Sequence, residues 1–405
     1  MNTAETIHEM AVKARAAASA LRRLTTAEKD AALLKIAETL EAESSALFAA
    51  NVEDVAAARE KGLPPAMVDR LTLTESRFRS MVEGVRSVAR LPDPVGETIW
   101  ERTRPSGITI RKVREPFGVV AVVFESRPNV FIDTAALCLK TGNAIILRGG
   151  KEAIRSNTAL AHSVAKALAE VDAGRGIADA VQLVTILDHE AVREMVRAVG
   201  LIDVAIPRGG ERLIRAMCEA ALIPVLKHYK GVCHIYVDDE ANLDMALAIL
   251  DNAKVQRPSA CNAAECLLVN ERIADVFLPR VEAWSNERGV RLHTDGVGTE
   301  YLSLDLNVAK VADWRAAIDF INAHSSHHSD CIVTENAAHA ADFLRDVDSA
   351  CVYHNASTRF TDGAEFGMGA EIGISTDKLH ARGPMGLEEL TTYKYTVCGN
   401  GTIRQ

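Results

Sequence analysis

The spacing of apolar residues divides the chain into a helical first quarter and a longer region in which strands and helices alternate. Within residues 1–101, Thr25 and Glu28 have the three-residue spacing of a capping box, as do Thr72 and Glu75. Each pair precedes apolar residues that recur at helical intervals. The sequence therefore predicts amphipathic helices here, with apolar faces that cover another part of the fold.

From Phe117 onward, continuous runs of β-branched residues alternate with helical stretches. We expect strands at 118–124, 143–147, 180–184, 201–206 and 233–237, and helices such as 129–140, 154–171 and 212–221. Apolar strands separated by helices are typical of a parallel sheet that is covered on both faces. The fold class that the sequence predicts is therefore α/β.

A second αβ run occupies about residues 238–355. We expect helices at 242–254, 273–284 and 314–323, and strands at 264–269, 309–311, 331–334 and 350–354. This run predicts a second domain of the same class.

Two stretches outside these domains have the character of exposed strands. In residues 103–115, Ile108, Ile110 and Val113 are interleaved with polar residues, which favours a strand or hairpin arm over a surface loop. Residues 390–397 form a terminal strand rich in threonine and tyrosine. Because a strand of this length is marginal alone, it should pair with another strand.

Composition and charge exclude several classes of protein. The 405 residues include 48% hydrophobic and 25% charged residues and carry a net charge of −9, without a basic stripe that would fit nucleic acid. The start of the chain lacks the features of a signal peptide, and the longest apolar run, 117–124, is too short to span a membrane. The eight cysteines contain no Cys-x-x-Cys pair, so we expect no metal site and no disulfide framework. These features favour a cytoplasmic protein with reduced thiols.

Cys261 is the strongest candidate for chemistry. It follows Pro258 and Ser259, which interrupt a helical pattern, and it precedes an apolar strand. A thiol presented by such a loop is a nucleophile if its thiolate is stabilised. The alternative is a buried structural cysteine, which is the commoner role of this residue type.

Two strands end in the same tripeptide, and each is followed by a helix. Arg148-Gly149-Gly150 follows one strand and Arg208-Gly209-Gly210 follows another. Paired glycines allow the backbone to approach a ligand closely, and the N-terminus of a helix favours an anion. The two turns are either ordinary turns or parts of a dinucleotide or phosphate site on one sheet.

Several motifs together resemble the aldehyde dehydrogenase superfamily and, within it, the gamma-glutamyl phosphate reductase family. They lie in order between about residues 117 and 395, and they are 124–130 (FESRPNV), 140–150 (KTGNAIILRGG), 206–210 (IPRGG), 226–234 (LKHYKGVCH), the cysteine loop and 366–387. The resemblance implies a Rossmann-like cofactor domain, an αβ catalytic domain and a β oligomerisation arm. We expect the cofactor domain at 1–101, 115–233 and 356–380, the catalytic domain at 234–355, and the arm at 102–114 and 381–405.

The resemblance also implies an activity: NADPH-dependent reduction of L-glutamyl 5-phosphate to L-glutamate 5-semialdehyde and phosphate, the second step of proline biosynthesis from glutamate. Cys261 would form the thioester, and Asn129 or Arg127 would assist its backbone N–H in binding the oxyanion. NADP binding would involve Arg148, Gly149, Gly150, Lys151, Arg208, Gly209, Gly210 and Glu300. Substrate binding would involve Arg127, Lys227, His228, Lys230 and Arg257.

Two departures from the wider superfamily refine this interpretation. Oxidising members carry a glutamate that activates water, whereas the corresponding stretch here, 227–231, is basic and contains no carboxylate. This suits a phosphorylated substrate and disfavours hydrolysis. Arg148 replaces the superfamily's lysine and Lys151 lies nearby, although Glu152 follows, and basic groups there favour the 2′-phosphate of NADP.

Alternative functions remain at this stage. One is another acylating or hydrolytic aldehyde dehydrogenase of the same fold, and another is a scaffold without activity, which the intact Cys261 argues against. The arm and the resemblance predict a homodimer or a higher homo-oligomer, and association with glutamate 5-kinase is a further candidate interaction. No membrane partner is expected.

Overall fold

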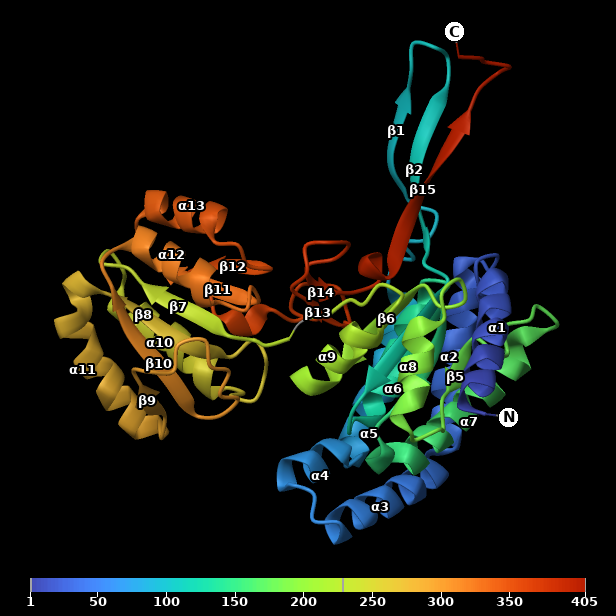
Figure 1. The fold of residues 1–405 in the computed structure, drawn as a ribbon, viewed down its shortest axis with the longest axis horizontal. Coiled ribbons are helices and arrows are strands. Elements are labelled where there is room, and N and C mark those ends of the chain that lie inside the picture. The colour runs from blue at the N-terminus through green and yellow to red at the C-terminus, as the bar shows by residue number, and fades with distance from the viewer. Residues whose placement is uncertain (1, 228, 405) are drawn as a thin grey trace. The chain divides into compact units, whose positions relative to one another are not determined.

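The computed structural model describes residues 2–227 and 229–404, which fold into two compact units (Figure 1). Unit 1 comprises Met1–Leu226, Met368–Gly373 and Met385–Gln405, and unit 2 comprises Lys227–Gly367 and Ile374–Pro384. Unit 2 thus begins before the boundary expected near residue 233 and continues beyond the one expected near residue 355. The early boundary has a local reason, because the backbone at Gly231 packs directly against that of Cys261 in unit 2.

A four-stranded parallel sheet forms the centre of unit 1. Its strands lie in the order β5 (Val181–Leu183), β4 (Ala144–Arg148), β3 (Val119–Phe124) and β6 (Val204–Arg208). Every residue of β3 and β4 is buried, as expected for strands covered on both faces. The predicted parallel α/β sheet is confirmed.

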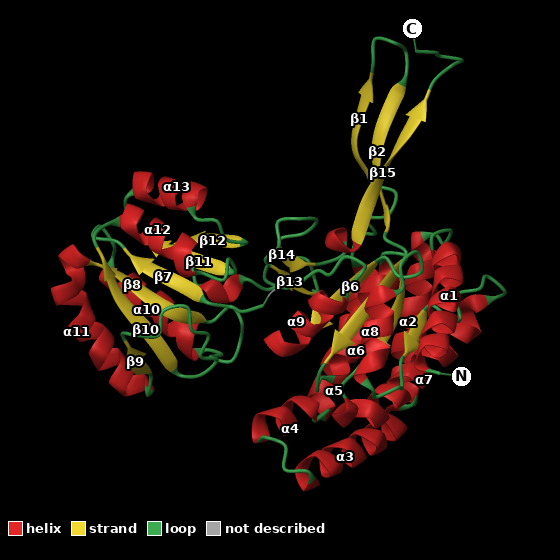
Figure 2. Ribbon diagram, viewed as in Figure 1, coloured by secondary structure: helices red, strands yellow, loops and turns green. Residues whose placement is uncertain are grey.

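Nine helices accompany this sheet in the described part of unit 1 (Figure 2). Helices α1, α6 and α8 contact β3, and α2 packs against α5, α6 and α7. Helix α8 was not predicted from the apolar pattern, and it begins where the Asp188 side chain accepts a hydrogen bond from Glu190 N–H. The helices are α1 (Thr3–Leu21), α2 (Thr26–Ala42), α3 (Ser44–Glu60), α4 (Pro65–Leu71), α5 (Glu75–Arg90), α6 (Pro128–Lys140), α7 (Ile154–Asp172), α8 (His189–Arg197) and α9 (Glu211–Ala220).

The arm is a three-stranded antiparallel sheet that projects from the rest of unit 1 (Figure 1). Strand β2 (Thr109–Pro116) lies between β1 (Thr98–Thr103) and the terminal strand β15 (Thr391–Cys398). The strand interpretation of both stretches is therefore confirmed, and each finds the partner that its length requires.

Unit 2 contains a six-stranded parallel sheet with helices on both faces. One apolar core packs α10 and α11 against the sheet around Leu250 and Phe277, and a second core packs α12 and α13 around Ile321 and Phe343. The strands, in spatial order, are β12 (Cys351–His354), β11 (Ser329–Val333), β7 (Cys233–Val237), β8 (Ala264–Asn270), β10 (Asp305–Val311) and β9 (Arg291–His293). The helices are α10 (Leu243–Val255), α11 (Glu271–Arg288), α12 (Trp314–His324) and α13 (Ala337–Asp346).

The remaining elements are short. Three single-turn 3₁₀ helices and one two-stranded sheet connect the larger elements, and they are η1 (Lys151–Ala153), η2 (Thr358–Phe360), η3 (Glu388–Leu390), β13 (Gly373–Ser375) and β14 (Gly383–Met385). Among the helices described, none has the length and apolar character that crossing a lipid bilayer requires.

Candidate active site

Cys261 lies in a loop between a helix and a central strand of unit 2, as the sequence predicts. Helix α10 ends at Val255 and β8 begins at Ala264, and the Cys261 side chain between them is partly exposed. Burial raises the pKa of three other cysteines, Cys138, Cys233 and Cys331, which keeps those thiols protonated and unreactive. Cys261 therefore differs from them in the exposure that a nucleophile needs.

The loop is anchored on its far side by Asn262, which is almost completely buried. Its side-chain amide donates to the backbone carbonyl of Thr361 at 2.8 Å, and the Asn262 backbone carbonyl accepts the Thr358 hydroxyl at 2.7 Å. The guanidinium of Arg359 donates to the Asn262 side-chain oxygen. These bonds fix the backbone next to the thiol to the segment around η2, which the sequence pattern did not connect with the loop.

A glycine allows a second segment to approach the cysteine. A Cβ at Gly231 would lie 1.8 Å from the Cys261 carbonyl oxygen, so only glycine fits at this position. The Gly231 N–H donates to Glu300 Oε1 at 2.8 Å, and the Cys233 thiol donates to the Cys261 carbonyl at 3.3 Å. Three predicted features, namely the 227–231 segment, Glu300 and the cysteine loop, are thus brought together in unit 2.

A fully buried ion pair lies next to this arrangement and holds the turn that carries Glu300. Lys254, near the end of α10, lies 2.7 Å from Glu265 on β8, and both side chains are inaccessible to solvent. The second carboxylate oxygen of Glu265 accepts the Leu302 N–H at 3.1 Å, which holds the turn that carries Glu300. Burial raises the pKa of Glu265 to about 7 and lowers that of Lys254. Neither Lys254 nor Glu265 was predicted as part of the site from the sequence.

The predicted basic residues of the substrate site have different environments. Lys227 forms an ion pair with Asp377 at 2.8 Å, whereas Lys230 is exposed. Arg257 is also exposed, on the cysteine loop. His228 lies outside the described residues.

In unit 1, the two glycine turns flank the loop that follows β3. They lie at the carboxyl ends of β4 and β6, the two neighbours of β3. Glu125, in the loop, accepts the Gly210 N–H at 3.1 Å, and Glu152 accepts the Ser126 N–H at 2.8 Å. Two carboxylates therefore join three loops at the edge of the sheet where α/β proteins bind nucleotides.

The first glycine turn contains unsatisfied polar atoms. Arg148 is 8% exposed and donates to the Leu187 carbonyl at 2.8 Å, but within the described chain its Nε has no partner. Burial lowers the pKa of Arg148.

Asn157, in the first turn of α7, is fully buried, and neither of its side-chain polar atoms has a described partner. A Cβ at Gly149 would lie 2.1 Å from Asn157 Nδ2, which explains the glycine. Buried orphan donors at a helix N-terminus fit a phosphate-containing cofactor.

Asn129 lies at the start of α6, where Arg127 is the N-cap residue. Its amide donates to Asp133, one turn later, at 2.9 Å, and it is exposed. Burial raises the pKa of Asp133 to about 6. Because an amide nitrogen carries two hydrogens, Asn129 retains a second donor while Asp133 orients the group.

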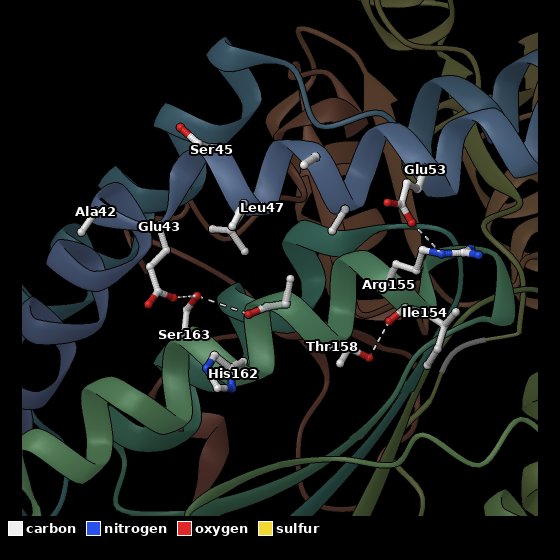
Figure 3. Close-up of a pocket in the computed structure, with 14 residues that line it drawn as sticks. Ala42, Glu43, Ser45, Leu47, Glu53, Ile154, Arg155, Thr158, His162 and Ser163 are labelled. Atoms are coloured by element: carbon white, nitrogen blue, oxygen red, sulfur yellow. Dashed lines mark hydrogen bonds and ion pairs between the residues drawn. The ribbon is translucent and has the colours of Figure 1, made fainter.

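Unit 1 also has a groove of about 1010 Å³ between α3 and α7 (Figure 3). None of the predicted site residues lines it. Its polar groups pair with one another: Glu43 accepts the Ser163 hydroxyl, and Glu53 pairs with Arg155 at 3.0 Å. Most other lining side chains are alanine or other small residues, so the groove offers little chemistry.

Comparisons with known proteins agree with this architecture. The model of the aldehyde dehydrogenase family matches residues 1–291. The gamma-glutamyl phosphate reductase of Moorella thermoacetica is 50% identical over 100% of both chains, and that of Thermobifida fusca is 49% identical over 98% of both. The crystal structure of gamma-glutamyl phosphate reductase from Thermotoga maritima superposes with a TM-score of 0.96, at 43% identity, over 98% of this chain and 100% of that one.

These relationships extend over nearly the entire chain, and they agree with the resemblance drawn from the motifs. The aldehyde dehydrogenase fold implies that the chain uses a nicotinamide cofactor. The chain belongs to the aldehyde dehydrogenase family and is an oxidoreductase of its gamma-glutamyl phosphate reductase group.

Proposed function

We propose that this enzyme reduces L-glutamyl 5-phosphate to L-glutamate 5-semialdehyde and phosphate with NADPH, the second step of proline biosynthesis from glutamate. The observation that carries the proposal is the partly exposed Cys261, held between Gly231 and Asn262, in a chain 50% identical to a gamma-glutamyl phosphate reductase.

Cys261 acts as the nucleophile in this mechanism. Its thiolate attacks the acyl carbon, the C–S bond forms, and the C–O bond to phosphate breaks so that phosphate leaves with the electron pair. We assign the Cys261 backbone N–H to binding the oxyanion, and Asn129, with Arg127 as its alternative, remains the candidate for a second donor. NADPH, when bound, supplies the hydride that reduces the resulting thioester.

The surroundings of Cys261 disfavour hydrolysis of the thioester by water. Among the described residues of the 227–231 segment there is no carboxylate that could activate water. Two carboxylates that contact this segment are already engaged, because Glu300 accepts the Gly231 N–H and Asp377 forms an ion pair with Lys227. We assign Lys227, Lys230 and Arg257 to attraction of the anionic substrate.

The first glycine turn supports the choice of NADPH over NADH. Glu152 is the acidic residue nearest to the turn in sequence, but its carboxylate accepts hydrogen bonds from both the N–H and the hydroxyl of Ser126. Both bonds engage Oε1, so one carboxylate oxygen is left for the ribose 2′-hydroxyl that NADH presents. Arg148 and Lys151 remain as cations for a 2′-phosphate. The second turn, Arg208-Gly209-Gly210, would bind the pyrophosphate.

Replacing both Arg148 and Lys151 with alanine should raise the KM for NADPH about tenfold or more, because each charge-assisted bond to a phosphate contributes about 1.5–3 kcal/mol. The KM for NADH should change little. Initial rates with each cofactor measure both values. Because Arg148 is buried, Lys151→Ala alone is the control for folding defects, and equal effects on the two cofactors would contradict the assignment.

We further propose that the arm forms a homodimer or a higher homo-oligomer. Tyr393, Tyr395 and Val397 on β15 are each about half exposed, and β15 is an edge strand. Edge strands with exposed apolar side chains are normally covered. Deletion of residues 388–405 should convert an assembly, measured by sedimentation at micromolar concentration, into monomer and aggregate. A full-length chain that is monomeric at every concentration would contradict the proposal.

We further propose that the enzyme is cytoplasmic. No disulfide joins the eight cysteines within the described chain, which agrees with a cytoplasmic enzyme. A complex with glutamate 5-kinase would protect the labile acyl phosphate, and co-sedimentation of the two purified enzymes tests it.

The forward reaction can be assayed by generating the acyl phosphate in place. Glutamate, ATP and a purified glutamate 5-kinase should support oxidation of NADPH by this enzyme, and omission of any one of them should stop it. NADPH oxidation that proceeds without the kinase would contradict the proposed substrate.

A further inference from the structure

The arginines of unit 2 fall into two groups. Six of the nine have a carboxylate within ion-pair distance, and these are Arg272, Arg280, Arg288, Arg291, Arg345 and Arg382. A seventh, Arg315, lies over an aromatic ring, 4.2 Å from the ring centroid. Throughout residues 2–227 and 229–404, no carboxylate lies within ion-pair distance of the other two, Arg257 and Arg359. Both of these exceptions adjoin the cysteine loop.

Arg359 forms hydrogen bonds with both ends of the cysteine loop. Its Nε donates to the Gln256 side-chain oxygen at 2.9 Å, and its Nη1 donates to the Asn262 side-chain oxygen. Gln256 and Asn262 immediately flank the segment from Arg257 to Cys261. The guanidinium therefore bridges the loop that carries the nucleophile, with neutral partners that leave its charge uncompensated.

The charges in this region interact with one another. Burial lowers the pKa of Arg359, and the nearby charge of Arg257 lowers it further, whereas Cys261 and Asp362 oppose the shift. The two arginines thus repel each other, and Arg359 is close enough to Cys261 to be affected by its charge. Asp362 is the one carboxylate in this group, and it accepts the Ala364 N–H. Two cations beside a nucleophile stabilise its thiolate and attract an anion.

We propose that Arg257 and Arg359 form the site for the phosphoryl group of the substrate in the forward reaction and for inorganic phosphate in the reverse reaction. This inference rests on the proposed function and adds Arg359 as a substrate-binding residue. When the Cys261 sulfur bonds to the acyl carbon, the electron pair of the breaking C–O bond passes to the leaving phosphate. Planar guanidinium groups match phosphate oxygens in pairs, so they bind this product at the point where its charge develops.

The alternative anion on the same substrate is the α-carboxylate at its other end. The phosphoryl group is bonded to the carbon that Cys261 attacks, whereas the α-carboxylate is several bonds farther away. Arginines that bridge the cysteine loop itself therefore fit the phosphoryl group better. The two assignments predict effects on different kinetic constants.

Arg359→Met should raise the KM for phosphate at least about tenfold in the reverse reaction, the equivalent of one charge-assisted bond. The KM for glutamate 5-semialdehyde should stay within about twofold. Arg359→Lys, which keeps the charge, should recover part of the loss. Arg345→Met, on the exposed helix α13, is the matched control and should leave both constants unchanged. A rise confined to the KM for the aldehyde would overturn the phosphate assignment in favour of the carboxylate.

A second measurement needs neither cofactor nor turnover. Inorganic phosphate should slow the alkylation of Cys261 by iodoacetamide with a saturable dependence in the wild-type protein, and this protection should be lost in Arg359→Met but not in Arg345→Met. Protection without any turnover of the semialdehyde would refute the proposed function and leave the phosphate site standing. Phosphate-dependent turnover with an unchanged KM in Arg359→Met would refute the site and leave the function. If Arg359→Met fails to fold, the KM for phosphate and the protection of Cys261 by phosphate can be measured in Arg257→Met and Arg359→Lys instead.

Discussion

Replacement of Cys261 with alanine should lower the rate of semialdehyde oxidation by about 10⁴-fold or more, because removal of a covalent nucleophile typically costs that much. The change removes one sulfur atom from a loop that Asn262 and Gly231 hold by their own contacts, so the fold should remain intact. Binding of NADPH, measured by fluorescence titration, should be almost unchanged, since the glycine turns belong to unit 1.

Cys398→Ser is the matched control for this experiment. Cys398 is exposed on the arm strand β15, and its replacement should leave turnover at the wild-type level. Near-normal turnover of Cys261→Ala would show that the covalent mechanism is wrong.

Replacement of Lys254 with methionine should lower the free energy of unfolding by about 3–5 kcal/mol, the usual cost of leaving one member of a buried ion pair without its partner. Lys254 and Glu265 are both inaccessible, and water does not compensate for the missing cation. Urea denaturation followed by circular dichroism measures the change. The double variant Lys254→Met/Glu265→Leu should recover much of the loss, because it removes the uncompensated carboxylate as well. A loss below about 1 kcal/mol in the single variant would contradict the account of the pair.

The same pair predicts how this loss depends on pH. Burial raises the pKa of Glu265 from its usual 4.5 to about 7, so the folded state binds this proton more tightly than the unfolded state does. The contribution of Glu265 to stability is therefore complete below about pH 4.5 and decreases as the pH rises toward 7. In Lys254→Met the carboxyl has no cation to offset its charge, so the loss of stability should be larger at pH 8 than at pH 5.5. A loss that is independent of pH would indicate a packing effect alone.

The elements with long, regular apolar patterns could be predicted from the sequence. The runs that became β3, β4 and β7 and the helices α6, α7 and α10 were expected within one or two residues of their observed bounds, because burial on one or both faces imposes a clear periodicity. Helix α8 was missed because it is only nine residues long, although Ala191, Val192, Met195 and Val196 form a buried apolar face at helical spacing. The pairing of β15 with β2 followed from the requirement that neither strand remain alone.

The candidate site was predictable only in part. Cys261 and the glycine turns could be predicted because each lies in a short local sequence motif. The contacts that position them join segments far apart in the chain, as between Glu125 and Gly210, Glu300 and Gly231, or Arg359 and the cysteine loop. A polar side chain has no periodicity that reveals its partner, so these roles emerge only when the tertiary structure is known.

The most direct test of the central claim is the formation of NADPH from glutamate 5-semialdehyde and NADP, measured at 340 nm with and without inorganic phosphate. If Cys261 forms a thioester that phosphate cleaves, continuous NADPH formation should require phosphate and should saturate with it, and coenzyme A should not replace it. Sustained NADPH formation in the absence of phosphate, or its restoration by coenzyme A, would contradict the account and assign the enzyme to the hydrolytic or the acylating aldehyde dehydrogenases.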